Sequence, residues 1–469
     1  MPEANPHLPA SGRCGAPAPA SRDLARDLTV SHASSVVVGS IIGTGIFLVP
    51  REMMQAVGSA KLVYLAWIVG GALSFLGALT YAELGAMKPE AGGEYVYLRD
   101  GYGPLAGFVY AWSTFLLAKP GSIATIATGM ARILGAFPAF DKLPQIAIAS
   151  PLLITYAQLL AIALVLFVSF INYIGVKRAG EFQLFFTLLK VGLVLTVIVV
   201  AFTYSGGRAA HYATVFEGAK GGMVGFMIAM LAALWAYDGW NNLNMVAGEI
   251  RRPERSIPIA LIAGVGTVGA LYMLMNAALQ YVMPAAQIAA TGSPAADAMR
   301  IVLGAGAASI FTLVMGFQML ATLNGSILSG ARVPFAAAHD GYFFPTLASV
   351  HPRYRTPSAA IVFQAALAIV LVLVVGKFQA LFSITLFAEW LFYMLTTSTV
   401  FIFRRREPDA LRPYRVWGYP VVPALFIVAS AVLLYYTFTD NVRNSLLGTL
   451  IMLAGIPVYY VFAGRRTRR

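Results

Sequence analysis

Long apolar runs recur along this chain and are separated by short stretches of polar and basic residues. A helix needs about 20 apolar residues to cross the hydrocarbon core of a bilayer. Lipid offers the backbone no hydrogen-bond partner, so such runs predict helices, and they lack the alternating pattern of barrel strands. Twelve runs are expected to span, and they begin near Val30, Leu62, Leu105, Leu152, Phe182, Met223, Ile257, Ala307, Ala359, Phe378, Val421 and Leu446.

Composition supports an all-α membrane protein. Hydrophobic residues make up 59% of the chain and charged residues only 11%, against about 25% charged residues in soluble domains. The net charge of +13 could suggest a nucleic-acid partner. However, most of the 33 Lys and Arg lie in the N-terminal tail, in every second loop and at the C-terminus. The positive-inside rule then predicts a multi-pass protein of the plasma (inner) membrane with both termini cytoplasmic and no nucleic-acid partner.

The predicted domain organisation follows from these runs. Residues 1–28 are expected to form a disordered cytoplasmic tail, because they are rich in Pro, Ala and Ser. The only cysteine, Cys14, lies there, so no intramolecular disulfide can form. Residues 29–205 would hold helices 1–5, residues 220–406 helices 6–10, and residues 418–464 helices 11–12. Residues 465–469 would form a basic cytoplasmic C-terminus.

The first span carries three glycines in seven residues, Gly39, Gly43 and Gly45. Small residues at helical spacing often mediate helix packing. Glycine also lets the backbone leave helical geometry and lets another group approach closely. The closely set Gly43-Thr44-Gly45, followed by further apolar residues, favours a broken helix.

The sixth span is interrupted in its middle by polar residues beside Gly239. An Asp and three Asn inside a membrane span are costly unless they face a cavity or partner helices. Contacts between helices could account for them, but four polar side chains beside a glycine favour a solvated site. These side chains are Asp238, Asn241, Asn242 and Asn244.

Two broken helices in corresponding positions of two five-helix halves are the best sequence indication of a transporter's binding site. Five helices reverse the direction of the sixth, so the halves would form an inverted repeat. Free N–H groups near Thr44, Gly45 and Ile46 could receive a carboxylate, helped by the helix dipole. Free carbonyls near Ile41, Trp235 and Ala236 could receive an ammonium group. A ligand that carries both groups on one carbon would bridge the two breaks.

At these residues the sequence resembles the amino acid–polyamine–organocation superfamily, and within it the L-type amino acid transporter group with its bacterial relatives. The likeness covers nearly the whole chain apart from the tail. Its motifs are residues 39–47 (GSIIGTGIF), 235–241 (WAYDGWN), 92–97 (GGEYVY), 253–258 (PERSIP), 324–326 (NGS) and 412–415 (RPYR).

The resemblance implies a LeuT-type fold of two inverted five-helix repeats plus two further helices. It also implies carboxylate binding by the glycine-rich backbone of span one, amino-group binding by carbonyls of span six, Trp235 as an aromatic gate, and Asn241 in the pocket lining. Asp238 departs from the glycine of animal members, and it could contact the ammonium or cap a half-helix. The implied substrate-binding residues are Ile41, Ile42, Gly43, Thr44, Gly45, Trp235, Ala236, Asp238, Gly239 and Asn241.

Lys190 lies deep in span five, where a lysine must donate to carbonyls or hydroxyls or give up its proton. The resemblance implies that it replaces a sodium ion between helices one, five and eight, with the Gly43 region and Ser326 as partners. Transport would then be sodium-independent. The sequence leaves open whether Lys190 is a fixed strut, which suits an exchanger, or a titrating group, which suits proton symport.

Glu389, beside Trp390 in span ten, is a second buried-charge candidate. It could line the cavity and contact a substrate side chain, or it could pair structurally. Both residues are candidates for the pocket or its gate. Lys119, followed by Pro120 in span three, is expected to be a structural partner.

Other functional classes fit less well. The five histidines fall in the tail, near the start of span one or in loops, with no metal-ligand spacing, so we expect no enzyme, no metal and no cofactor. A channel would favour repeated pore-lining polar residues. The family's disulfide-linked heavy subunit needs an extracellular cysteine, which this chain lacks. We therefore expect a sodium-independent exchanger of neutral L-amino acids; a proton-coupled symporter, or a transporter of a cationic amino acid or related amine, is the alternative.

Overall fold

The computed structural model describes residues 24–135, 146–148, 154–374, 378–440 and 442–466. The predicted tail up to residue 23, with Cys14, the start near Leu152 and the last three residues of the basic C-terminus lie outside this part.

The first part of the chain is built almost entirely from helices. Its elements are α1 (Val30–Ile41), α2 (Gly45–Val57), α3 (Ala60–Met87), α4 (Glu94–Tyr102), α5 (Pro104–Ser113), the π-helical turn η1 (Thr114–Ala118), α6 (Lys119–Gly135), the antiparallel pair β1 (Ile146–Ile148) and β2 (Ile154–Thr155), α7 (Tyr156–Tyr173), α8 (Val176–Phe202), the 3-10 turn η2 (Ala209–Ala213), α9 (Gly222–Ala236), α10 (Asn242–Met245) and the 3-10 turn η3 (Ala247–Glu249). The strand pair is a small departure from the all-α expectation.

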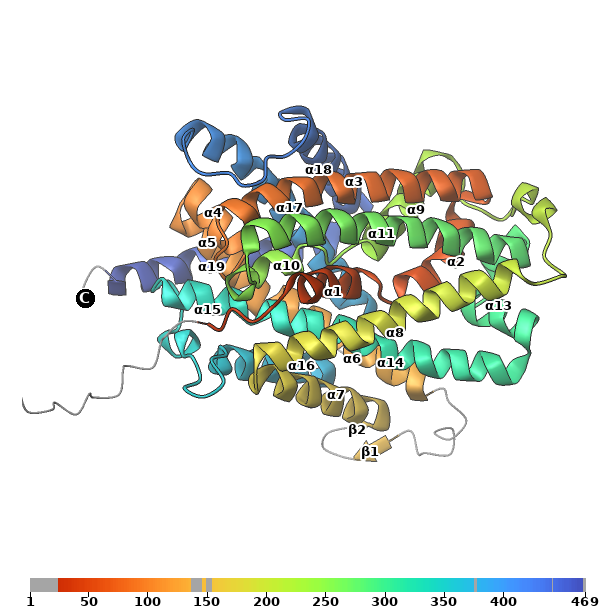
Figure 1. Cartoon of the computed structure of the whole chain (residues 1–469), viewed down its shortest axis with the longest axis horizontal. Coiled ribbons are helices and arrows are strands. Elements are labelled where there is room, and N and C mark those ends of the chain that lie inside the picture. The colour runs from red at the N-terminus through yellow and green to blue at the C-terminus, as the bar shows by residue number, and fades with distance from the viewer. Residues whose placement is uncertain (1–23, 136–145, 149–153, 375–377, 441, 467–469) are drawn as a thin grey trace, which may run out of the picture.

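The remainder is again helical. Its elements are α11 (Pro253–Val282), α12 (Ala285–Ala290), α13 (Pro294–Leu303), α14 (Ala305–Gly330), α15 (Arg332–His339), the 3-10 turn η4 (Pro345–Ala348), α16 (Ser358–Val374), α17 (Phe378–Arg406), α18 (Val421–Asp440) and α19 (Val442–Arg466). Figure 1 shows the long helices α3, α8 and α11 running nearly side by side along the long axis, with α1 and α2 as separate short segments near the middle.

In the described part of the chain, eight segments are long and apolar enough to cross a membrane: α1 with α2, α3, α7, α8, α11, α14 with α15, α18 and α19. α9 and α16 are shorter apolar helices, and η1 separates α5 from α6. The prediction of a helical membrane protein is confirmed, whereas these eight segments do not by themselves establish twelve spans.

The broken first segment lies at the centre of the bundle. Its most apolar window is 78% buried, against 50% or less for each of the other seven segments. α1 packs against α8, α11 and α14, and α2 packs against α9. A segment covered on all sides by other helices can carry non-helical backbone at membrane depth, because protein rather than lipid surrounds it.

One end of the bundle, which we call the N-face, holds the start of α1 and lies on the left in Figure 1. Leu28 forms a parallel bridge with Ile250 there. Arg332 of α15 forms a bidentate ion pair with Glu249, at 2.8 and 3.0 Å, and both side chains are fully buried. The ion pair joins η3, which follows α10, to α15.

Candidate functional site

The backbone between α1 and α2 is not helical. α1 ends at Ile41, α2 begins at Gly45, and the intervening residues are Ile42, Gly43 and Thr44. The Thr44 carbonyl accepts the N–H groups of residues 47 and 48, at 3.1 and 3.2 Å, which starts α2. The N–H groups of the first turn of a helix have no acceptor within it. This break therefore offers donors at the positive end of α2.

A second break follows α9. The helix ends at Ala236, and Gly239 adopts a φ of 104°, a conformation that favours glycine. α10 then begins at Asn242. The Asp238 N–H donates to the Trp235 carbonyl at 3.2 Å, and a carbonyl oxygen retains a second lone pair after accepting one bond. The end of α9 therefore offers acceptors where α2 offers donors.

The two breaks pack directly against each other. A Cβ added to Gly45 would lie 3.0 Å from the Cα and Cβ of Ala236, and one added to Gly239 would lie 3.1 Å from the Ser40 Cβ. These glycines are needed because the backbones approach so closely. The Tyr272 hydroxyl of α11 lies between the two helix ends. It donates to the Ala236 carbonyl at 2.8 Å and to the Ile41 carbonyl at 3.0 Å.

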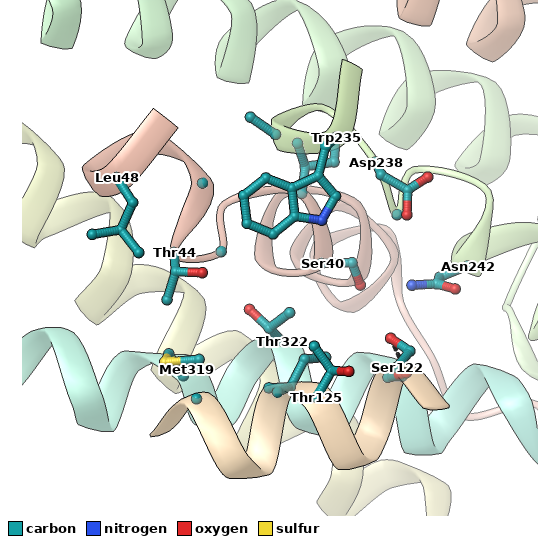
Figure 2. Close-up of a pocket in the computed structure, with 18 of the residues that line it drawn as sticks. Ser40, Thr44, Leu48, Ser122, Thr125, Trp235, Asp238, Asn242, Met319 and Thr322 are labelled. Carbon is teal, nitrogen blue, oxygen red and sulfur yellow. Dashed lines mark hydrogen bonds between the residues drawn. The ribbon is translucent and has the colours of Figure 1, made fainter. Parts of the chain in front are cut away.

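A cavity of about 350 Å³ lies against both breaks. Residues at helical spacing form its opposite wall, so each helix presents one face. α6 contributes Ser122, Thr125 and Gly129, and α14 contributes Met319, Thr322 and Ser326. Figure 2 shows the Trp235 indole between Thr44 and Leu48 on one side and Asp238 and Asn242 on the other. The cavity reaches an exposed mouth at Glu52, toward the end of the bundle opposite the N-face.

Charged side chains concentrate at the inner end of this cavity. Lys119, Asp238 and Glu389 all line it. The Lys119 ammonium donates to the Asn242 Oδ1 at 2.5 Å, and the Tyr393 hydroxyl donates to the Asp238 Oδ1 at 2.8 Å. Among the described residues, no group of three or more His, Cys, Asp and Glu could hold a metal ion.

Lys190 is fully buried behind the first break. Its ammonium donates to the Gly39 carbonyl at 2.7 Å and to the Thr322 hydroxyl at 2.8 Å. It therefore joins α8, α1 and α14, the three helices that the resemblance implies, although through other atoms than expected. Ser326 instead donates to Ser122 at 3.3 Å, because it lies one helical turn beyond Thr322 on the same face of α14.

Ten of the fourteen predicted site residues line this cavity. They are Ile41, Gly43, Thr44, Gly45, Trp235, Ala236, Asp238, Gly239, Ser326 and Glu389. Ile42 is fully buried and, like Lys190, does not line it. Trp390 packs its ring against Tyr393 and Phe426.

Asn241 was expected to line the cavity, but its neighbour Asn242 does so. The Asn241 amide instead donates to the fully buried Glu94 at 2.8 Å. Successive side chains on a helical turn point about 100° apart, so adjacent residues of this turn face different surroundings. Glu94 also accepts a hydrogen bond from the Tyr110 hydroxyl at 2.7 Å.

Several lining or linking residues were not predicted. Tyr272 lies in an ordinary apolar run and gives no sequence signal. Thr322 could have been found, because it precedes Ser326 by four residues and so shares its helix face. The small residues Gly121, Thr125 and Gly129 repeat every four positions after Lys119, a pattern that indicates close approach along one face of α6.

Comparisons with known proteins show the family to which the chain belongs. The family model described as amino acid permease matches residues 28–463. The serine/threonine exchanger SteT of Bacillus subtilis is 33% identical over 94% of this chain and 98% of its own length. The human b(0,+)-type amino acid transporter 1 is 32% identical over 95% and 89%, and the human cystine/glutamate transporter is 28% identical over 98% and 89%. The chain belongs to the amino acid permease family of the amino acid–polyamine–organocation superfamily, which comprises transporters rather than enzymes.

Proposed function

We propose that the protein is a sodium-independent secondary transporter that exchanges neutral L-amino acids across the plasma (inner) membrane by alternating access. The observation that carries the proposal is the meeting of two helix breaks at one cavity. One break offers N–H donors at a helix start, and the other offers carbonyl acceptors. An α-amino acid carries the complementary carboxylate and ammonium on a single carbon.

The α-carboxylate would bind the N–H groups around Thr44 and Gly45, where the helix dipole adds to the hydrogen bonds. The α-ammonium would bind carbonyls near Ile41 and Ala236, which Tyr272 already holds together. The Trp235 indole would cover the side chain. Two of the relatives are named as exchangers or transporters of specific amino acids, serine and threonine in one and cystine and glutamate in the other.

Lys190 supports independence from sodium. Its side-chain nitrogen lies between α1, α8 and α14 and donates to a carbonyl and a hydroxyl. Oxygen ligands of this kind suit a small hard cation as well as an ammonium group. In this proposal the tethered lysine takes the place of a dissolved ion.

The proposed architecture has twelve spans, with two inverted five-helix repeats at 29–205 and 220–406. The N-face would be cytoplasmic, together with both chain termini. The buried Arg332–Glu249 pair at the N-face and the mouth at Glu52 would then fit an outward-facing form. No disulfide-linked heavy subunit is proposed, because the single cysteine, Cys14, belongs to the tail.

The test is exchange in proteoliposomes loaded with unlabelled serine, with labelled serine outside. We expect uptake to require internal amino acid and to be equal in sodium and choline buffers. Uptake that needs a sodium gradient would contradict the role of Lys190. Uptake into empty liposomes driven by an imposed proton gradient would indicate proton symport instead of exchange.

A further inference from the structure

The inner end of the cavity lies beyond the two helix breaks and is built from three other places in the fold. Lys119 begins α6, Asp238 lies between α9 and α10, and Glu389 lies on α17. Lys119 directly follows the π-helical turn η1. Such turns shift the register of the following side chains and are frequent at functional sites. Lys119, the first residue after this turn, lines the cavity wall.

Of the two acidic side chains at this end of the cavity, Asp238 forms a hydrogen bond and, in the part of the chain that the structure describes, Glu389 does not. Lys119 donates to Asn242, and Asp238 accepts a bond from Tyr393. Within the described residues, Glu389 forms no hydrogen bond and no ion pair shorter than 4.0 Å, although it lies in the electrostatic field of Lys119, Asp238 and Glu94. Glu389 is one of the residues that line the cavity.

Acidic side chains outnumber basic ones here. Asp238 and Glu389 line this end of the cavity together with one lysine, Lys119. A buried charge is costly unless it is paired and hydrogen-bonded. The hydroxyl of Ser40, a cavity-lining residue only 6% exposed, also lacks a hydrogen-bond partner among the described residues. As far as the structure describes its lining, the cavity thus presents an unpartnered hydroxyl and more acidic than basic side chains.

We propose that Glu389 is a specificity-determining residue that pairs with a cationic side chain, an ammonium or guanidinium group, on an amino acid bound at the two helix breaks. This inference rests on the proposed function. The Trp235 indole would lie over the aliphatic part of that side chain, between Thr44 and Asp238 (Figure 2). Neutral amino acids would bind through the same breaks without this pair, so the substrate range would include both classes.

The experiment compares lysine with norleucine, which has the same carbon chain and no side-chain ammonium, as competitors of labelled serine exchange. We expect lysine to compete better in the unaltered protein. Glu389→Gln should reduce the preference for lysine about tenfold or more, because it keeps the shape but removes the charge, and norleucine competition should change little. Lys119→Met should act in the opposite direction and raise the preference for lysine.

Two further variants locate the effect. Glu181→Gln removes an exposed carboxylate on α8 and serves as the control for net charge, with an unchanged preference expected. Glu52→Gln removes the carboxylate at the cavity mouth and should have a smaller effect than Glu389→Gln. Equal effects at Glu52 and Glu389 would overturn the proposal. They would indicate that the overall electrostatic field of the cavity favours lysine, and not a direct pair between Glu389 and the lysine side chain.

An unaltered protein that exchanges serine and norleucine but shows no preference for lysine would also overturn this inference, while leaving the proposed function intact. A protein that exchanges none of the three would contradict the proposed function itself. Should Glu389→Gln fail to fold, thermal stabilisation of the unaltered protein and of Glu389→Asp by each amino acid gives a second measurement. Equal stabilisation by lysine and norleucine in the unaltered protein would contradict the pair.

Discussion

The Lys190 ammonium donates to the carbonyl of Gly39 at 2.7 Å, so a lysine on α8 holds α1 three residues before its break begins at Ile42. Thr322 of α14 accepts the second bond. Because this lysine is fully buried, its two acceptors supply the stabilisation that solvent would otherwise give.

Replacing Lys190 by Met should reduce exchange at least about tenfold, because α1 loses its link to α8 and α14 and both acceptors lose their donor. Initial exchange rates in proteoliposomes check this. Lys177→Met, on the exposed surface of the same helix, should leave the rate unchanged. If Lys190 is a fixed strut that does not titrate, the remaining activity of Lys190→Ala should keep the pH dependence of the unaltered protein. Loss of that dependence would show that Lys190 titrates.

Replacing Tyr272 by Phe should weaken amino acid binding while the fold is retained. The hydroxyl joins the ends of α1 and α9, and removing it leaves two buried carbonyls without this donor, at a cost of about 1–3 kcal/mol. The Michaelis constant for exchange should rise several-fold, and the melting temperature should fall. Tyr212→Phe is the matched control, because its hydroxyl donates to the Ala277 carbonyl at 2.9 Å away from the cavity. Equal effects of the two variants would show that Tyr272 contributes only to stability.

Replacing Gly43 by Val should abolish binding without unfolding the protein. A Cβ at this position would meet no atom nearer than 3.9 Å, so the larger side chain enters the cavity instead of clashing with the backbone. Thermal stabilisation by serine measures the loss of binding, and the melting temperature of the free protein reports folding. Gly266→Val, at an exposed position of α11 with no atom within 4 Å, controls for a valine within a helix. Serine binding by Gly43→Val with normal affinity would remove the proposed site.

Breaking the pair between Arg332 and Glu249 should favour a form that is open at the N-face. Removing one partner of a buried ion pair leaves the other uncompensated, which costs about 3–5 kcal/mol. Arg332→Met should therefore increase the modification of cysteines introduced at the N-face side of the cavity. Combining it with Glu249→Met should restore part of the closed form. Lys177→Met, which breaks an exposed pair, should change modification little. Unchanged modification in Arg332→Met would show that other contacts keep this face closed.

Much of the fold could be predicted because apolar runs and interrupted runs are local signals. Predicted span starts at Val30, Phe378 and Val421 coincide with the first residues of α1, α17 and α18. The two breaks lie where Gly43 and Gly239 suggested. Helix interruption depends on glycine and on polar residues within a few positions, so the sequence carries this information directly.

The details of the site depend on orientation, which a sequence pattern does not contain. Asn241 and Asn242 are equally polar, and only the turn after Gly239 decides that Asn242 faces the cavity. The role of Lys119 depends on the π-helical turn before it, whose residues resemble an ordinary helix. Tyr272 acts through its distance from two carbonyls that lie 231 and 36 residues away along the chain.

The contact between Gly45 and Ala236 also sets the distance between the carboxylate and ammonium groups of a ligand. With the start of α2 and the end of α9 in direct backbone contact, the proposed carboxylate and ammonium sites are held at a fixed, short separation. An amino acid whose two groups share one carbon matches it. β-Alanine places one more carbon between the same groups, so it should compete poorly with alanine for exchange although its charge and composition are identical.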